Sequence, residues 1–375
     1  MATENVYRRL QQHIDNMPVA YPATRSGVEL RLLEHLFTPE EAEMALHLNA
    51  LPEPVERIHR RARKAEIGLE ELKEGLHRLA EKGAIIRKQV EGEPAYSKAM
   101  LAIGMYEFQA GRITKDYHSD MRQYMDEGFA EAILTRKTSQ LRTIPISEEV
   151  LPDRRIGTYD GARALVMNSD GPFAVIPCVC RDGMDLEGEP CKQTEIRETC
   201  LLMGNHAAEM VRTGRGRALS KEEMVGMLDQ AREVGMVLQP QNTQDPNFIC
   251  CCCGCCCAVL ATAKKLPRPA EYFDVNYHAG IDEELCAECR CCGDRCEMDA
   301  IIYTDGPSVV DLHRCIGCGQ CVSACPQGAI RLYEKPGAKP PPKTQDDLYM
   351  KIATERFGYL GMAKIVAKKT LGMKI

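Results

Sequence analysis

Two sets of four cysteines with the same spacing, C-x2-C-x2-C-x3-C, lie 29 positions apart near the end of this 375-residue chain. An Ala-Ile pair follows each set at the same distance, as Ala300-Ile301 and Ala329-Ile330, so the two halves form an internal repeat. A repeat this regular restricts the fold, because each half must place its thiols in the same local geometry. The two sets are Cys286, Cys289, Cys292 and Cys296, followed by Cys315, Cys318, Cys321 and Cys325.

The spacing indicates iron–sulfur ligation, because three thiolates placed three positions apart can wrap three corners of a [4Fe–4S] cube. The fourth cysteine lies at the start of a short helix and points toward the other cube, so the ligand sets cross over. A zinc site would need four ligands rather than eight in two matched sets. Cluster one is predicted to take Cys286, Cys289, Cys292 and Cys325, and cluster two Cys315, Cys318, Cys321 and Cys296.

From about Ile281 to Lys335 the repeat resembles bacterial two-cluster ferredoxins, which implies a ferredoxin-like fold that passes electrons one at a time. A hairpin between the halves, over 300–312, is expected to cover the clusters. The chain departs from the family at Glu297, which follows Cys296 where the second half keeps the usual proline. It also has an extra thiol, Cys291, which we expect to pack as a small apolar side chain rather than to bind iron.

All twenty cysteines lie between Cys178 and Cys325, which argues for metal ligands rather than for the disulfide framework of a small secreted domain. Beyond the repeat and Cys291, eleven remain, in the segments CVCRDGMDLEGEPCKQTEIRETC and FICCCCGCCC. Seven thiols in eight residues exceed what packing or one zinc ion would require, so at least one further iron–sulfur cluster is predicted. Two clusters, or one non-cubane cluster, are open alternatives. Ligands are expected among Cys178, Cys180, Cys191, Cys200, Cys250, Cys252, Cys253, Cys255 and Cys256.

Residues 27–105 show the pattern of a winged helix. Thr38-Pro39-Glu40-Glu41 contains a capping box that starts one helix, two more helices are expected near 55–64 and 69–82, and a hairpin follows over 84–100. The order resembles small winged-helix transcription regulators, which implies DNA contact through the third helix. The first turn of that helix carries glutamates that would repel phosphates, so we expect contact with protein rather than with DNA.

These patterns predict an α+β chain of four parts. They are a winged-helix-like helical domain over 1–139, a cysteine-rich α/β iron–sulfur domain over 140–275, a two-cluster ferredoxin-like domain over 276–335, and a Pro-rich spacer with a C-terminal helix over 336–375. The short run around Gly254 is similar to the cysteine-rich domains of heterodisulfide reductases. The whole order resembles ferredoxin-like iron–sulfur proteins of anaerobes, which share a CxCR segment, an ICxCCGCC run and a terminal two-cluster module.

The net charge of −6 argues against nucleic-acid binding, which usually requires a basic surface. No run of about 18 or more uncharged apolar residues occurs, so no transmembrane segment is expected. The first residues lack the apolar core of a secretory signal, which predicts a cytoplasmic protein. The basic C-terminal helix, expected over 346–369, is predicted to dock on a partner, with peripheral contact to an anionic membrane as the alternative.

We therefore predict a non-catalytic electron carrier, or the electron-transfer subunit of an anaerobic oxidoreductase. Residues 281–335 contain ten Asp and Glu against five Arg and Lys, which favours docking to a basic patch on a redox partner such as an oxidoreductase or flavoprotein. Two alternatives belong to other classes. One is a redox-sensing winged-helix transcription regulator, and the other is a reductase with catalysis at the cysteine run 250–257.

Overall fold

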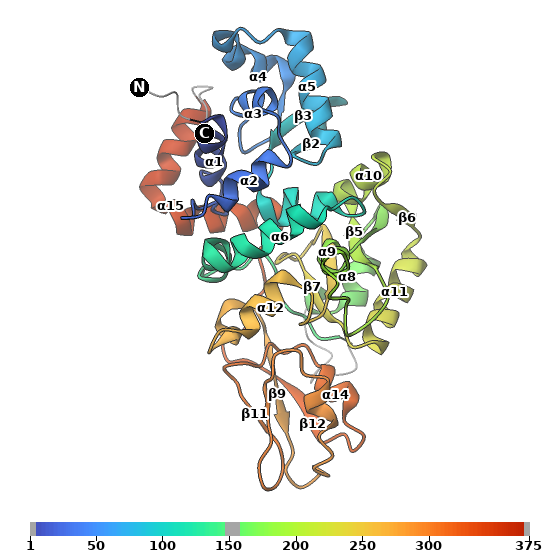
Figure 1. Ribbon diagram of the computed structural model, residues 1–375. Coiled ribbons are helices and arrows are strands. Elements are labelled where there is room, and N and C mark those ends of the chain that lie inside the picture. The colour runs from blue at the N-terminus through green and yellow to red at the C-terminus, as the bar shows by residue number, and fades with distance from the viewer. Residues whose placement is uncertain (1–4, 147–157, 371–375) are drawn as a thin grey trace. The chain divides into compact units, whose positions relative to one another are not determined.

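The computed structural model describes residues 5–146 and 158–370, and it divides into two compact units (Figure 1). One unit comprises Met1–Ile133 with Met350–Ile375, and the other comprises Leu134–Tyr349. The cysteine-rich segment and the cysteine repeat therefore share one unit, while most of the C-terminal helix belongs to the other. The chain has both helices and antiparallel sheets, in agreement with the predicted α+β class. The four predicted domain boundaries stay a prediction.

The first half of the N-terminal unit contains five helices and a three-stranded sheet of order β1-β3-β2. The capping box between Thr38 and Glu41 starts α3 as predicted, because each residue bonds the backbone of the other. Helix α5 lies where the third helix is expected, and it buries Leu72, Leu76 and Leu79 on one face. The elements are α1 (Val6–Asp15), α2 (Val28–Glu34), α3 (Pro39–Ala45), β1 (Glu53–Pro54), α4 (Val55–Ala62), η1 (Arg63–Ala65), α5 (Leu69–Glu81), β2 (Ile85–Val90) and β3 (Glu93–Lys98).

The rest of this unit is helical. Its elements are η2 (Leu101–Met105), η3 (Glu107–Gln109), α6 (Lys115–Tyr124), η4 (Met125–Phe129), α7 (Ala130–Leu134) and α15 (Gln345–Thr370), whose last residues fall in a different unit from its first. Gly358 has a φ of 66° and interrupts α15. Before this break, Arg356 forms an ion pair with Asp15 at 3.0 Å, so this part of α15 packs within the unit. No helix among the described residues is long and apolar enough to cross a membrane.

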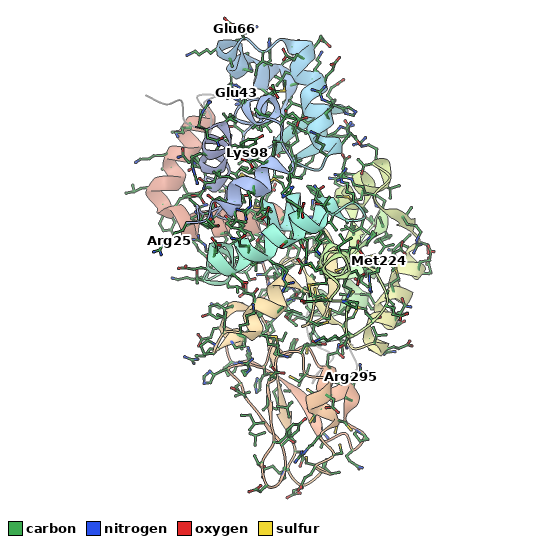
Figure 2. The ribbon with its side chains drawn as sticks, in the orientation of Figure 1. Arg25, Glu43, Glu66, Lys98, Met224 and Arg295 are labelled. Carbon is green, nitrogen blue, oxygen red and sulfur yellow. The ribbon has the colours of Figure 1, made fainter. Side chains whose placement is uncertain are left out.

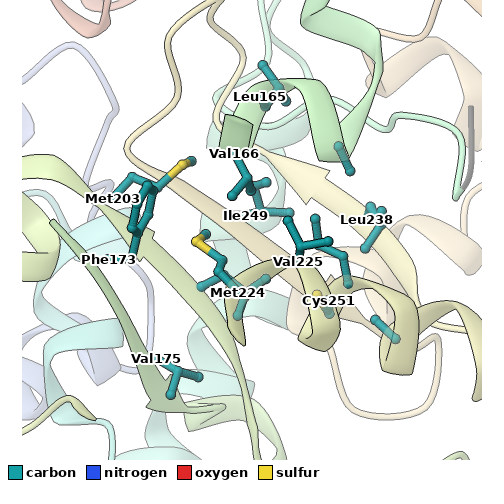
Figure 3. Packing of buried hydrophobic residues seen from close by; sticks show 14 of the residues in the cluster. Leu165, Val166, Phe173, Val175, Met203, Met224, Val225, Leu238, Ile249 and Cys251 are labelled. Atoms are coloured by element: carbon teal, nitrogen blue, oxygen red, sulfur yellow. The ribbon is translucent and has the colours of Figure 1, made fainter. Parts of the chain in front are cut away.

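The second unit is built on a five-stranded antiparallel sheet of order β6-β4-β5-β8-β7. Alternate strand residues point to opposite faces, and one face packs with α8 and α11 into an apolar core. Figure 3 shows Cys251 among the apolar side chains of this core. The elements are η6 (Thr158–Asp160), α8 (Ala162–Asn168), β4 (Phe173–Pro177), α9 (Val179–Glu187), β5 (Glu198–Met203), α10 (Gly204–Arg212), β6 (Arg217–Leu219), α11 (Lys221–Glu233), β7 (Val237–Pro240) and β8 (Phe248–Cys252).

The cysteine repeat forms a smaller lobe of the same unit, with two two-stranded sheets. Strand β9 pairs with β12, and β10 pairs with β11 to form the predicted hairpin between the halves. Helix α12 lies between this lobe and the large sheet (Figure 1). The elements are α12 (Ala258–Lys264), η7 (Pro269–Tyr272), β9 (Tyr277–Ile281), α13 (Cys291–Asp294), β10 (Ile301–Ile302), β11 (Val309–Val310), α14 (Gln320–Ala324) and β12 (Ile330–Glu334).

Polar contacts, among them a buried ion pair, join this lobe to the rest of the unit. Asp160 forms a buried ion pair with Arg142 and also accepts hydrogen bonds from Asn276 (3.0 Å) and Tyr277 (3.2 Å) at the start of β9. Arg295, labelled in Figure 2, donates to the carbonyl oxygen of Glu233 at 3.1 Å. Buried charges stabilise a structure only when they are paired, so these contacts hold the two parts of the unit in one arrangement.

Candidate metal-binding sites

The second half of the repeat surrounds a cavity. Gly317, in the loop of this half, has a φ of 62°. Residues other than glycine rarely adopt this backbone conformation. A Cβ atom there would also lie 2.4 Å from the carbonyl oxygen of Tyr277, so glycine lets the loop pass close to β9. The cysteines that line the cavity are Cys315, Cys318 and Cys321 from this half and Cys296 from the first half.

The first half surrounds a second cavity. Its cysteine lining is Cys286, Cys289 and Cys292 from this half and Cys325 from the second half. Each cavity therefore joins three sulfurs of one half to the last sulfur of the other. The structure brings together the two crossed sets that the spacing predicts, and cluster ligation by these sets is proposed below.

Backbone N–H groups point at the last sulfur of each half. Ala300 donates to Sγ of Cys296 at 3.2 Å, and Ala329 donates to Sγ of Cys325 at 3.3 Å. The repeated alanine therefore contributes a backbone donor four residues after the cysteine. Such bonds stabilise a thiolate and tune an iron–sulfur cluster bound to it.

Burial acts on the thiols in the opposite direction to these N–H groups. Removal from water raises the pKa values of Cys296, Cys318 and Cys321. A buried thiol with a raised pKa still ionises when a cation binds it, because the positive charge favours the thiolate. The eight thiols around two cavities thus fit metal clusters chemically.

The two cavities differ in exposure. Cys289 is exposed, and the backbone N–H of Cys291 lowers the pKa of its thiol. The extra thiol, Cys291, bonds the carbonyl oxygen of Cys289 at 3.8 Å. At the second cavity, the carbonyl oxygen of Cys318 accepts a hydrogen bond from the backbone N–H of Ile146 at 2.9 Å. The side chain of Gln320 donates to the carbonyl oxygen of Met236 at 2.6 Å. The first cavity therefore faces solvent, and the second faces the large sheet.

Glu297 links the repeat to the long cysteine run. Its carboxylate accepts the backbone N–H of Gly254 at 2.6 Å, and burial raises the pKa of the carboxyl group. A Cβ atom on Gly254 would lie 2.5 Å from the same carboxylate, so glycine is needed for this approach. The departure from proline after Cys296 thus has a structural role, since a glutamate at this position bonds the backbone between Cys253 and Cys255.

The long cysteine run is divided among three environments because strand β8 alternates its faces. Cys251 points into the apolar core and is 3% exposed. Cys250 and Cys252 point to the opposite face. After the strand ends, a turn closed by a hydrogen bond from the N–H of Cys257 to the carbonyl oxygen of Cys253 redirects the remaining thiols.

Four thiols form a group that we name the compact group: Cys191, Cys253, Cys255 and Cys256. Their sulfur atoms all lie within 4.8 Å of one another. Sγ of Cys191 is 3.7 Å from that of Cys253 and 3.7 Å from that of Cys255, and the sulfurs of Cys255 and Cys256 are 3.6 Å apart. A hydrogen bond from Cys256 lowers the pKa of Cys253 to about 4, although burial alone would raise it.

Six other thiols gather around the face of β8 opposite the core, and we name them the sheet group: Cys178, Cys180, Cys200, Cys250, Cys252 and Cys257. Cys200 lies directly opposite Cys250 in the β5–β8 ladder, with 3.8 Å between the sulfurs. A hydrogen bond from Cys180 lowers the pKa of Cys178 to about 6. Cys257 contacts Cys252 and has a raised pKa. Cys257 is not among the ligands predicted from the sequence, because its position depends on the turn after β8.

Arg181 lies between these two groups and is completely buried. Its guanidinium donates to Oγ1 of Thr199 at 2.5 Å and to the carbonyl oxygen of Cys251 at 3.2 Å. Within the described ranges, no carboxylate pairs with it. Burial would lower its pKa, but the thiolates of Cys178 and Cys253 raise it overall. The cysteine groups therefore provide the negative charge that a buried guanidinium requires.

Residues 308–331 match a family described as the 4Fe-4S binding domain. A stretch of 48 residues is 49% identical to an uncharacterized ferredoxin of Methanocaldococcus jannaschii and covers 12% of this chain. This part of the chain is an iron–sulfur module similar to ferredoxins. The chain spans 32% of the length of that relative. No solved structure matches this chain. We call residues 276–335 the ferredoxin-like module.

Proposed function

We propose that the ferredoxin-like module binds two [4Fe–4S] clusters and that the protein carries electrons one at a time. The observation that carries this proposal is the pair of cavities, each lined by four cysteines of which one comes from the other half. Cys286, Cys289, Cys292 and Cys325 would hold one cluster, and Cys296, Cys315, Cys318 and Cys321 the other. When bound, such clusters accept and release single electrons at potentials set by hydrogen bonds to sulfur and by exposure.

We propose that a redox partner docks on the side of the module where Cys289 is exposed. The side of Cys318 is unsuitable for this, because its backbone and Gln320 contact the large sheet. The module carries ten acidic residues against five basic ones, so a partner with a basic surface would be attracted to it. Association should then slow as salt concentration rises, because salt screens exposed charges.

We propose a further iron–sulfur cluster bound by a subset of the sheet group, with one ligand from each close pair such as Cys200 and Cys250, whose sulfurs lie 3.8 Å apart. The six thiols of the group come from α9, β5, β8 and the turn that follows, and a hydrogen bond from Cys180 and then the buried charge of Arg181 lower the pKa of the Cys178 thiol. Glu297 joins this part of the unit to the second cavity through the N–H of Gly254. The protein would then be an electron carrier, or an electron-transfer subunit of an oxidoreductase, in the cytoplasm of an anaerobe.

For the N-terminal unit we propose a winged helix that binds protein. The element order α3, β1, α4, α5, β2, β3 supports this interpretation. The first turn of α5 carries Glu70 and Glu71, which would repel phosphates. Two arginines of α4 are also engaged, because Arg57 and Arg61 both form ion pairs with Glu53. In a gel-shift assay under anoxia we expect no promoter binding, and tight binding that is lost on oxidation would favour a redox-sensing regulator.

Cluster binding is tested by purifying the full chain under anoxia and comparing Cys289→Ala, Cys321→Ala and the control Cys291→Ala. Iron, acid-labile sulfide and the electron paramagnetic resonance spectrum of the reduced protein are measured. We expect each of the first two variants to lose one of the two signals of the module with about four irons. The control should keep both signals, because Cys291 lines neither cavity. Zinc in place of iron, or disulfides among these eight sulfurs, would overturn the proposal.

A further inference from the structure

We propose that the compact group, Cys191, Cys253, Cys255 and Cys256, binds a single tetrahedral metal ion, zinc or iron, and not an iron–sulfur cluster. This site is separate from the module and does not rest on the proposed function. The sequence predicts these four cysteines as ligands of a cluster together with the others of the middle segment. The positions of their sulfur atoms point to a different kind of centre.

The distances between the sulfurs match a mononuclear site. An ion bonded to four thiolates at about 2.3 Å in tetrahedral geometry holds the sulfurs about 3.8 Å apart. The sulfur of Cys191 lies 3.7 Å from those of Cys253 and Cys255, and Cys255 and Cys256 have sulfurs 3.6 Å apart. A cube of iron and sulfide placed among four thiolates would need a wider separation, because its own atoms fill the space between them.

The ferredoxin-like module provides an internal comparison within the same structure. Its two cysteine sets each line a cavity. In the part of the chain that the structure describes, the compact group is the one set of three or more Cys, His, Asp or Glu side chains with all ligand atoms within 4.8 Å of one another. The fold therefore gathers these four sulfurs around a point, while it spreads the module's sulfurs around hollow spaces.

Local structure explains how three ligands come from four consecutive residues. Cys253 follows strand β8 directly, Gly254 begins a turn, and Cys255 and Cys256 lie in that turn, so side chains at positions i, i+2 and i+3 converge. The fourth ligand, Cys191, comes from the loop after α9. Met184 of α9 packs against Cys253 and Cys256 and shields the site from water. A set of four protein ligands leaves no open position, which is the arrangement of a structural or electron-transfer ion.

Charge supports an anionic centre at this place. A divalent ion that displaces one proton from each of four thiols leaves a complex with a net charge of −2. Cys253 and Cys256 are 1% and 6% exposed, so water solvates the charge on these two thiolates poorly. Arg181 is completely buried, and its guanidinium donates to the carbonyl oxygen of Cys251, two residues before Cys253, at 3.2 Å. The guanidinium is thus placed as the counter-charge of the complex.

The test uses the full chain purified under anoxia, as wild type, Cys255→Ala and Cys251→Ala. Cys255 is the compact-group ligand at the more exposed end of the turn, while Cys251 lies in the same run but points into the apolar core. Zinc, iron and acid-labile sulfide are measured per chain. We expect Cys255→Ala to lose one zinc or one iron with sulfide unchanged, and Cys251→Ala to retain it. Loss of sulfide together with several irons, or loss of no metal, would overturn the proposal.

A measurement on the wild type covers the case in which Cys255→Ala fails to fold. X-ray absorption at the zinc edge should show four sulfurs at about 2.3 Å with no metal neighbour. If the ion is iron, Mössbauer spectra should contain a component of one iron per chain with the parameters of an isolated tetrahedral thiolate site. Spectra in which every iron belongs to a sulfide-bridged cluster, together with a protein free of zinc, would refute the single-ion site. Either result is independent of the two cavities of the module.

Discussion

The ferredoxin-like module and the middle cysteine groups hold similar numbers of thiols but organise them in different ways. In the module, thiols three positions apart in one loop surround each cavity, and backbone N–H groups of Ala300 and Ala329 point at the sulfurs. In the middle groups, thiols from distant segments meet because β5 pairs with β8. There the main charge near the sulfurs is a buried side chain, Arg181.

The difference shows two routes to a thiolate site. A short repeated loop provides both the ligands and their hydrogen-bond donors, so the geometry is local and spacing predicts it. A sheet instead brings together ligands that are far apart in the chain, so the site depends on strand register and on one compensating charge. Substitutions that distort the backbone should therefore destabilise the module most. Substitutions that remove the compensating charge should destabilise the middle groups most.

The largest effect is expected for Arg181→Met. The substitution leaves ionised thiolates buried without their counter-charge, which should lower the free energy of unfolding by about 4 kcal/mol. Urea unfolding followed by circular dichroism under anoxia measures this loss. Metal bound at the middle groups should fall, while the two signals of the module persist.

Arg181→Lys is the control for this comparison. Lysine keeps the positive charge but lacks the planar fork that reaches Thr199 and Cys251 together, so it should recover only part of the stability and metal content. If Arg181→Met retained full metal content in the middle groups, the proposed dependence on a buried charge would be wrong.

Gly317→Ala tests the module in the same way. The residue has a φ of 62°, and a Cβ atom would lie 2.4 Å from the backbone oxygen of Tyr277. The conformational cost and the steric conflict together should lower the free energy of unfolding by about 3 kcal/mol and remove the iron of the second cavity. Gly306→Ala is a matched control, because a Cβ atom there meets nothing within 4 Å. Equal iron contents in the two variants would contradict the prediction.

Glu297→Ala tests the contact between the two regions. The variant leaves the N–H of Gly254 without its charged acceptor at 2.6 Å, which should cost about 2 kcal/mol. Glu297→Gln keeps an oxygen acceptor without the charge and should lose less. Urea midpoints measured for both variants would show this order, and an unchanged midpoint for Glu297→Ala would mean that the bond does not stabilise the unit.

Local patterns in the sequence predicted much of the module and several helix starts. The capping boxes at Thr38 and Ser220 were predictable, because they join residues three positions apart. The hairpin between the cysteine sets was predictable because its two strands are close in the sequence. The crossed sets that line each cavity follow from the spacing together with the known behaviour of the fourth cysteine.

The arrangement of the middle cysteines was not predictable from the sequence. Which thiols of the run 250–257 share a site depends on the face of β8 that each occupies and on the turn after it. Cys251 lies in the core because of the face of β8 that it occupies, and Cys257 joins the sheet group because of the turn after β8. The burial of Arg181 was missed as well, since arginine is mostly found at the surface.

The smallest effect is expected for the pH dependence contributed by His278. Burial, and then the charge of Lys335, lower the pKa of His278 below its usual value of about 6.5. The unfolded chain therefore binds a proton more readily than the folded chain at pH values just below 6.5, so this residue makes stability rise as pH increases through that window. Urea midpoints measured between about pH 5.5 and pH 7 should show this rise.

His278→Phe isolates that contribution. The ring of His278 stacks on Tyr333 across the β9–β12 pair, with 5.9 Å between centroids, and phenylalanine preserves a ring at this position. The variant cannot take up a proton, so its urea midpoint should change less with pH than that of the wild type. An identical pH dependence in the two proteins would assign the effect to other groups and leave the β9–β12 pair of the module insensitive to protonation.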